Sequence, residues 1–189
     1  MPPHIYMAEL DDERFLRVLD KCAQPLINYL WKYLGSRYDA EDAAADAFVK
    51  LYRRVKRFDS DDKLTAYLYR TATNIANNIK RRKKISRIFS FALLRKKEDG
   101  NTDSIVENIA DSDEKNPAVS YEDERKRKII RDAISRLPPY QRAAIILFYY
   151  EGKTYQEISA ILKKSIPSVE SLIFRARSNL SRVLSGFFV

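Results

Sequence analysis

Residues 154–180, TYQEISAILKKSIPSVESLIFRARSNL, decide the architecture of the C-terminal third of the chain. Thr154 can cap a helix, and Glu157 three residues later completes a capping box. Ser165 can cap a second helix with Pro167 in its first turn. Apolar residues recur at steps of three and four through both segments, as in helices with one buried face. The stretch therefore predicts a helix–turn–helix.

The outer face of the second helix suggests what this helix–turn–helix could bind. It carries Ser168, Glu170, Ser171, Phe174, Arg175, Arg177 and Ser178. A helix held from one side can place its N-terminal half in the major groove of DNA, which is about 12 Å wide, while basic residues further along contact phosphates. An ordinary helical hairpin with a solvated face would show the same spacing. Spacing alone leaves both interpretations open.

The N-terminal half also has a helical pattern. Apolar residues recur at helical spacing over Phe15–Leu34, and Pro25 is expected to kink or divide this segment. Asp39 is expected to cap the next helix, whose apolar stripe covers residues 44–55. A third helix is expected to begin at about Leu64 and to end in the basic cluster that follows. Since no segment shows sustained strand alternation, we predict an all-α protein.

Charge divides the chain into two domains. Residues 80–97 carry basic charges without an acid, whereas residues 98–124 carry acids against Lys115 alone. After this acidic stretch, a helix is expected over 121–137 and another over 140–151, separated by Pro138 and Pro139. We therefore expect two small helical domains, residues 1–97 and 121–189, joined by an acidic linker, residues 98–120.

The composition excludes several classes of protein. One Cys and one His among 189 residues exclude an internal disulfide and a thiolate zinc site, and remove most His-based catalysis. The acids form no paired constellation, so we expect no enzyme, no cofactor and no metal site. The longest apolar run, residues 143–150, is far shorter than the roughly 20 residues that cross a bilayer, and the N-terminus shows no secretion signal. We expect a cytoplasmic protein whose net charge of +9 favours an anionic partner, nucleic acid before an acidic membrane surface or protein.

Three stretches together resemble the bacterial sigma-70 family. The first, ISRLPPYQRAAIILFYYEGKTYQEISAILKKSIPSVESLIFRARSNL (134–180), resembles the domain that binds the promoter −35 element. DAEDAAADAFVKLYR (39–53) resembles the helix that grips the polymerase clamp. AYLYRTATNIANNIKRRKK (66–84) resembles the helix that reads and melts the −10 element. The chain has no room for an additional middle domain, which is the layout of the small extracytoplasmic-function (ECF) class.

The resemblance implies three sets of contact residues. The polymerase-binding set is Glu41, Asp42, Asp46 and Val49, and its alternative is a solvated helix face. The −10 set is Arg70, Asn74, Asn77, Asn78, Lys80, Arg81, Arg82 and Lys83. The −35 set is Lys153, Ser168, Glu170, Ser171, Arg175 and Arg177, with Arg142 and Arg182 as further phosphate candidates.

The resemblance also implies how the −10 element is opened. A base would be flipped from the stack into a pocket formed by the loop Asp59–Leu64, which must offset a cost of a few kcal/mol. Tyr67 and Tyr69 could stack on bases, with core packing as the alternative, favoured for Tyr67.

The function implied by the resemblance is that of a sigma factor without catalytic activity of its own. Its partners would be core RNA polymerase, promoter DNA and an anti-sigma factor, with no small-molecule substrate and no membrane insertion, and the free protein would be a monomer. An autonomous DNA-binding regulator would use only the helix–turn–helix and leaves the N-terminal motifs unexplained. A nucleic-acid-processing enzyme lacks a catalytic constellation. A basic amphipathic membrane binder lacks a clear apolar face in the basic tract.

Overall fold

The computed structural model describes residues 3–95 and 121–187. Within these ranges the regular structure consists of α-helices and one short 3-10 helix, without a strand. This confirms the all-α prediction. The expected linker, residues 98–120, lies outside the described residues.

The N-terminal half is a three-helix bundle. Helices α1 (Pro3–Leu34), α2 (Arg37–Tyr52) and α3 (Asp61–Arg95) pack against one another, and a 3-10 helix (Val55–Arg57) connects α2 to α3. Leucines from all three helices fill the centre: Leu26, Leu30, Leu51, Leu64 and Leu68. The buried side of α2 also carries four alanines, whose small side chains let α1 and α3 approach closely.

Three local predictions for this half are wrong. Of the two outcomes expected for Pro25, division of the helix is wrong: α1 continues through it, because buried residues on both sides, such as Cys22 and Leu26, hold the helix against the bundle. The cap of α2 is Ser36, whose Oγ accepts a hydrogen bond from the backbone N–H of Asp39 at 3.2 Å. Asp39 already lies in the first turn. The third helix begins at Asp61 and continues through the basic residues to Arg95.

The C-terminal half contains α4 (Tyr121–Arg136), α5 (Pro139–Tyr149), α6 (Tyr155–Leu162) and α7 (Ile166–Leu184). The predicted capping box of α6 is confirmed: the Glu157 N–H donates to Thr154 Oγ1 at 3.2 Å, and the Thr154 N–H donates to a Glu157 carboxylate oxygen at 2.8 Å. Lys163 ends α6 in the left-handed conformation, with φ of 51°, and turns the chain into α7. The helix–turn–helix is therefore α6 and α7.

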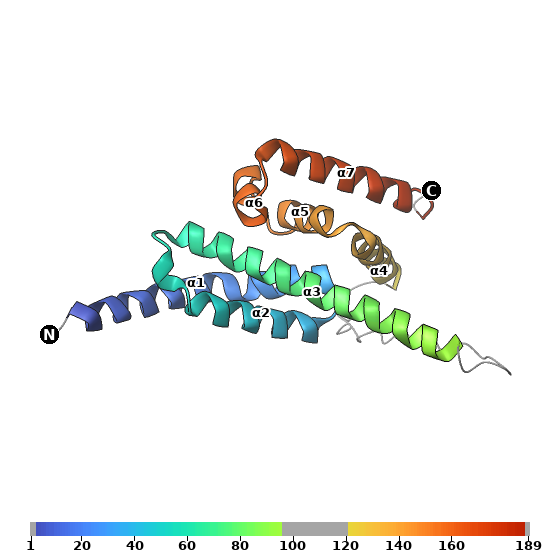
Figure 1. Ribbon diagram of the computed structural model, residues 1–189. Coiled ribbons are helices and arrows are strands. Elements are labelled where there is room, and N and C mark those ends of the chain that lie inside the picture. The colour runs from blue at the N-terminus through green and yellow to red at the C-terminus, as the bar shows by residue number, and fades with distance from the viewer. Residues whose placement is uncertain (1–2, 96–120, 188–189) are drawn as a thin grey trace.

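The two halves pack against each other. Figure 1 shows α4–α7 on one side of α1 and α3, and α2 on the other side. Tyr33 Oη on α1 donates to the backbone carbonyl of Pro139 at 3.2 Å, and Tyr69 Oη on α3 donates to Glu151 Oε2 at 3.5 Å. Burial raises the pKa of Tyr33 to about 12, so it remains a neutral hydrogen-bond donor. The outer face of α2 stays clear of the C-terminal half. Among the described helices, none combines the length and apolar character needed to cross a membrane.

Candidate polymerase and promoter interfaces

The four expected polymerase-binding residues share the outer face of α2. Glu41, Asp42, Asp46 and Val49 are all exposed, because the alanines on the opposite side bury the other face of the helix. Glu41 accepts a hydrogen bond from Nε of Arg37 at 2.9 Å, an exposed pair one turn apart. Asp42 and Asp46 project from adjacent turns.

Sequence reasoning missed three further members of this face. Tyr38 is 71% exposed, Tyr52 is 51% exposed and Ala45 lies between them. Positions 38, 42, 45, 49 and 52 follow one another at steps of four and three, so they form one line along the helix. The same periodicity that located the buried stripe could have located this exposed one. We call Tyr38, Glu41, Asp42, Ala45, Asp46, Val49 and Tyr52 the α2 stripe.

Five of the expected −10 residues lie along one exposed side of α3. Arg70, Asn74 and Asn78 follow one another at steps of four, and Arg81 and Arg82 lie three and four residues after Asn78; Arg70 is partly buried and the others are exposed. We call these five residues the reading face. Two asparagines on successive turns offer amide groups that can each donate and accept hydrogen bonds, and the arginines beside them suit phosphates.

Two other expected −10 residues are occupied by contacts within the N-terminal half. Asn77 is partly buried, and its Oδ1 accepts a hydrogen bond from Tyr33 Oη at 2.5 Å. Lys83 forms an ion pair with Asp39 of α2.

Lys80 is partly buried and faces the C-terminal half. Burial, together with the positive charges of Arg142, Arg87 and Lys83, lowers the pKa of Lys80 to about 8. This lysine is therefore held in an unfavourable position while the two halves are packed together.

The two tyrosines of α3 have different environments. Tyr67 is partly buried beside the reading face, with its ring centre 5.0 Å from that of Phe58 and with Arg54 and Arg70 over the ring at 5.8 and 5.4 Å. Tyr69 is 2% exposed and packed against the C-terminal half, which contradicts the expectation that it can stack on bases in this arrangement. Periodicity could not reveal this, because the contact is made by the other domain.

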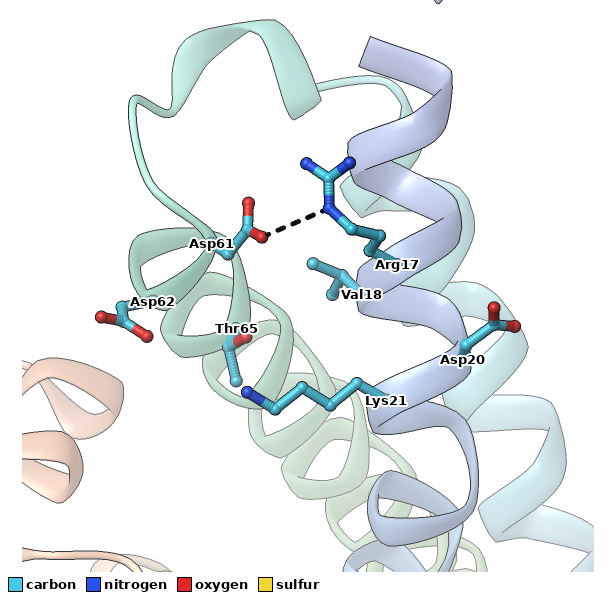
Figure 2. Close-up of a pocket in the computed structure, with 7 residues that line it drawn as sticks. All are labelled: Arg17, Val18, Asp20, Lys21, Asp61, Asp62 and Thr65. Atoms are coloured by element: carbon cyan, nitrogen blue, oxygen red, sulfur yellow. Dashed lines mark ion pairs between the residues drawn. The ribbon is translucent and has the colours of Figure 1, made fainter. Parts of the chain in front are cut away.

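A cavity of 550 Å³ lies between α1 and the start of α3 (Figure 2). Asp61 and Asp62, from the segment expected to hold a flipped base, line it together with Thr65, Arg17 and Lys21. Thr65 and Asn74 are nine residues apart, or about two and a half turns, so they lie on opposite sides of α3. Figure 2 shows Arg17 directed at Asp61, with 3.8 Å between Nε and Oδ2, so the charges of the cavity partly neutralise each other. This cavity is not aligned with the reading face.

The outer face of α7 carries most of the expected −35 residues. Ser168, Glu170 and Arg175 are exposed, Ser171 is partly exposed, and Phe174 between them is 73% exposed. The hydroxyls of Ser165 and Ser168 lie 2.9 Å apart at the start of the helix. The face is presented outward because Val169, Ile173 and Ala176 are buried on the other side.

Lys153 and Arg177 lie away from this face. Lys153 Nζ is 5.5 Å from the ring centre of Tyr69 in the N-terminal half and 3.5 Å from Glu157 Oε1. Arg177 lines a 340 Å³ groove between α4, α5 and α7, beside Ile130 and Tyr149.

The expectation that Arg142 contacts DNA phosphate is wrong. Arg142 is 6% exposed, and its guanidinium donates to the carbonyls of Ser135, Leu137 and Ile134 at 2.6, 2.7 and 3.2 Å. These carbonyls belong to the end of α4 and the residue after it, where helical partners are missing. Arg142 therefore stabilises the junction of α4 and α5. In the described part of the chain, no group of His, Cys, Asp and Glu side chains could hold a metal ion.

Known proteins match both halves of the chain. Residues 18–85 match Sigma-70 region 2, and residues 127–180 match Sigma-70 region 4. The chain is 34% identical over 153 residues to the ECF RNA polymerase sigma-E factor of Escherichia coli (strain K12), covering 76% of this chain and 75% of that protein. It is 26% identical to the RNA polymerase sigma-H factor of Pseudomonas aeruginosa, covering 92% of this chain and 88% of that protein. The structure of CnrH in complex with the cytosolic domain of CnrY has the same fold, with a TM-score of 0.65 at 18% identity over 95% of this chain and 97% of that one.

A two-domain helical chain with region 2 and region 4 in this order is a sigma factor of the sigma-70 family. The chain belongs to the ECF RNA polymerase sigma factors, non-catalytic subunits that direct the polymerase to specific promoters and initiate transcription there. The region 2 match accounts for the N-terminal half, which a stand-alone regulator would leave unexplained.

Proposed function

We propose that three exposed faces divide the work of this sigma factor. The α2 stripe binds core RNA polymerase, the reading face of α3 contacts the −10 element, and the outer face of α7 contacts the −35 element. The domains that carry these faces correspond to residues 1–97 and 121–189, joined by the linker 98–120.

The composition of the α2 stripe supports its role in polymerase binding. It combines acids with exposed apolar side chains, including Val49 and Tyr52, on a side of the bundle that the C-terminal half leaves free. Protein interfaces commonly have an aromatic or apolar centre with charged residues around it. Asp42 and Asp46 would face basic groups on the polymerase.

The observation that carries the −10 assignment is the alignment of Asn74 and Asn78 with Arg70, Arg81 and Arg82 on one side of α3. Asparagine can pair with adenine through two hydrogen bonds, and arginine can hold the phosphates that fix the register. Tyr67, beside this face, could stack on a base of the opened strand. Lys80 would join the contact once the two halves separate, because it is partly buried beside Arg142 in the packed arrangement. Asn77 would join it once its hydrogen bond to Tyr33 within the N-terminal half is broken.

The residues of α7 favour a particular kind of −35 sequence. Glu170 can accept a hydrogen bond from the N4 amino group of cytosine, and Phe174 can contact the methyl group of thymine. Arg175 can contact guanine or a phosphate. Arg182 would supply a phosphate contact at the edge of this surface, and Arg177 would do so beside the apolar groove. Lys153, which lies against Tyr69 in the packed arrangement, would contact phosphate once the two halves separate.

We also infer an anti-sigma partner and a cytoplasmic location. The support for the partner is that solved structures of similar fold contain one: CnrH bound to the cytosolic domain of CnrY, and the sigma factor RpoE bound to the anti-sigma factor NepR from Bartonella quintana. The support for the location is that bacterial RNA polymerase and chromosomal DNA are cytoplasmic. The free protein would be a monomer in which the two halves pack together.

The experiment that tests the division of work is transcription in vitro from a promoter recognised by the wild-type protein. We expect N74A/N78A to reduce transcript yield by about 30-fold or more, since each of the two base contacts discriminates by about 1–3 kcal/mol, while polymerase binding is retained. The matched control is N28A, which removes from α1 an asparagine amide whose Oδ1 accepts a hydrogen bond from Gln24 Nε2 at 3.0 Å. Equal losses in both variants, or no loss in N74A/N78A, would contradict the assignment.

A further inference from the structure

The C-terminal part of α3 carries apolar side chains that none of the proposed contacts uses. Ile85, Ile88 and Phe89 are 59%, 60% and 64% exposed. Figure 1 shows this end of α3, in light green, extending beyond the other helices of its bundle. The match to region 2 ends at residue 85, so this extension goes beyond the part of the chain shared with the family model.

The sequence suggested that the basic tract has no clear apolar face, and the structure corrects this. Because α3 remains helical to Arg95, Ile85, Ile88 and Phe89 come to one side of the helix at steps of three and one. Ile85 and Phe89 follow Asn78 by seven and eleven residues, which is about two and three helical turns. The apolar side chains therefore continue the line of the reading face.

This alignment places the apolar residues over DNA whenever the reading face contacts it. They lie about 10–16 Å further along the helix than Asn78, at a rise of about 1.5 Å per residue. A helix that follows the groove would bring them over base pairs about three to five positions from those that Asn78 contacts, at about 3.4 Å per base pair. A helix that crosses the groove would bring them over nearer positions.

We propose that Ile85, Ile88 and Phe89 form a second reading element that contacts thymine methyl groups in the promoter DNA next to the −10 element. The inference rests on the proposed role of the reading face. The thymine methyl group is the apolar feature of the major groove, and apolar side chains distinguish thymine from the other bases by contacting it. The protein would therefore prefer thymines at positions beside the −10 element that its asparagines do not touch.

The charges around the apolar residues favour DNA over a second copy of the chain. Arg81, Lys84 and Arg87 are exposed on the same segment, and no acid lies between Lys80 and Phe89. Two such segments would repel each other, whereas phosphates on both sides of a groove complement them. The asparagines on the same line are suited to base edges rather than to a lipid surface.

The test uses the complete protein bound to core RNA polymerase and a promoter library randomised over ten base pairs on each side of the −10 element. We expect the wild type to enrich thymines at positions within about five base pairs of one edge of that element. I85S/I88S/F89S should lose this enrichment and retain the −10 sequence itself. The matched control L16S removes a similarly exposed apolar residue from α1, and should behave like the wild type.

A second measurement isolates the methyl group. Replacing the enriched thymines by deoxyuridine removes only that group, and should weaken wild-type binding roughly fourfold per contacted base while leaving the triple variant unchanged. No enrichment, or equal effects of deoxyuridine on both proteins, would overturn the proposal. The proposal would also be overturned if the triple variant kept the thymine preference and lost another property, namely polymerase binding, self-association or binding to anionic vesicles. Failure to select any −10 sequence would count against the proposed role of the reading face itself.

Discussion

We expect recognition of a promoter to require that the two halves of this protein move apart. In the structure they touch: Tyr33 Oη is 3.2 Å from the carbonyl oxygen of Pro139, and Tyr69 Oη is 3.5 Å from Glu151. The −10 and −35 elements are separated by about 25 base pairs, or about 85 Å at 3.4 Å per base pair. Domains in direct contact cannot reach both elements of straight DNA, so we expect a separation of several tens of ångströms on promoter binding.

This separation can be measured by energy transfer between two dyes. Asp20 on α1 and Gln156 on α6 are exposed and could be replaced by cysteine for labelling. The native Cys22 is buried and would be replaced by alanine so that it does not react. Free protein should show efficient transfer, and protein in a complex of polymerase and promoter should show almost none. The complex with polymerase alone shows whether the polymerase suffices to open the contact.

The same experiment has a clear contrary result. Efficient transfer in the promoter complex, with both elements protected from cleavage, would mean that the halves stay together and that the DNA bends to meet them. Inefficient transfer in the free protein would mean that the packing between α1, α3 and the C-terminal half is not maintained in solution.

Three further outcomes follow from single side chains. R142M should lower the unfolding free energy in urea by about 3 kcal/mol, because three carbonyls lose a charged donor; a loss below about 1 kcal/mol would contradict this. Burial and neighbouring cations lower the pKa of Lys80 to about 8 in the packed form. The packed form should therefore become more favourable as pH rises from about 8 towards the ordinary value of 10.5, and energy transfer in K80M should lack this pH dependence. E170K should change the preferred base at its −35 position from cytosine to guanine, as measured by selection from a randomised −35 library. An unchanged base preference would show that Glu170 does not contact DNA.

The sequence predicted the helices well because their patterns are local. The capping box of Thr154 and Glu157 and the apolar steps of the helix–turn–helix depend on residues within one or two turns. The exposed acids of α2 were predicted for the same reason. The cap of α2 was misassigned because both Ser36 and Asp39 are suitable cap residues, and only the backbone conformation of Ser36 decides between them.

Contacts between distant segments could not be predicted in this way. Arg142 and Tyr69 both have residue types typical of nucleic-acid contacts, yet each is buried by a neighbour that sequence spacing does not reveal. The exposed side of α3 beyond Lys84 was missed because the helix was expected to end in the basic cluster. Because α3 continues to Arg95, the apolar residues Ile85, Ile88 and Phe89, which are interspersed with polar residues in the sequence, come to one side of the helix.

The most direct test of the central claim is binding to bacterial core RNA polymerase, measured by co-elution on a sizing column. We expect the wild type to co-elute in a one-to-one complex, and D42K/D46K to weaken the complex because it reverses two charges of the α2 stripe. The matched control is E13K/D20K, which reverses two exposed acids on α1 outside the stripe and should co-elute like the wild type. Equal binding by D42K/D46K and the wild type would show that the α2 stripe does not hold the polymerase, and no binding by the folded wild type would contradict the account as a whole.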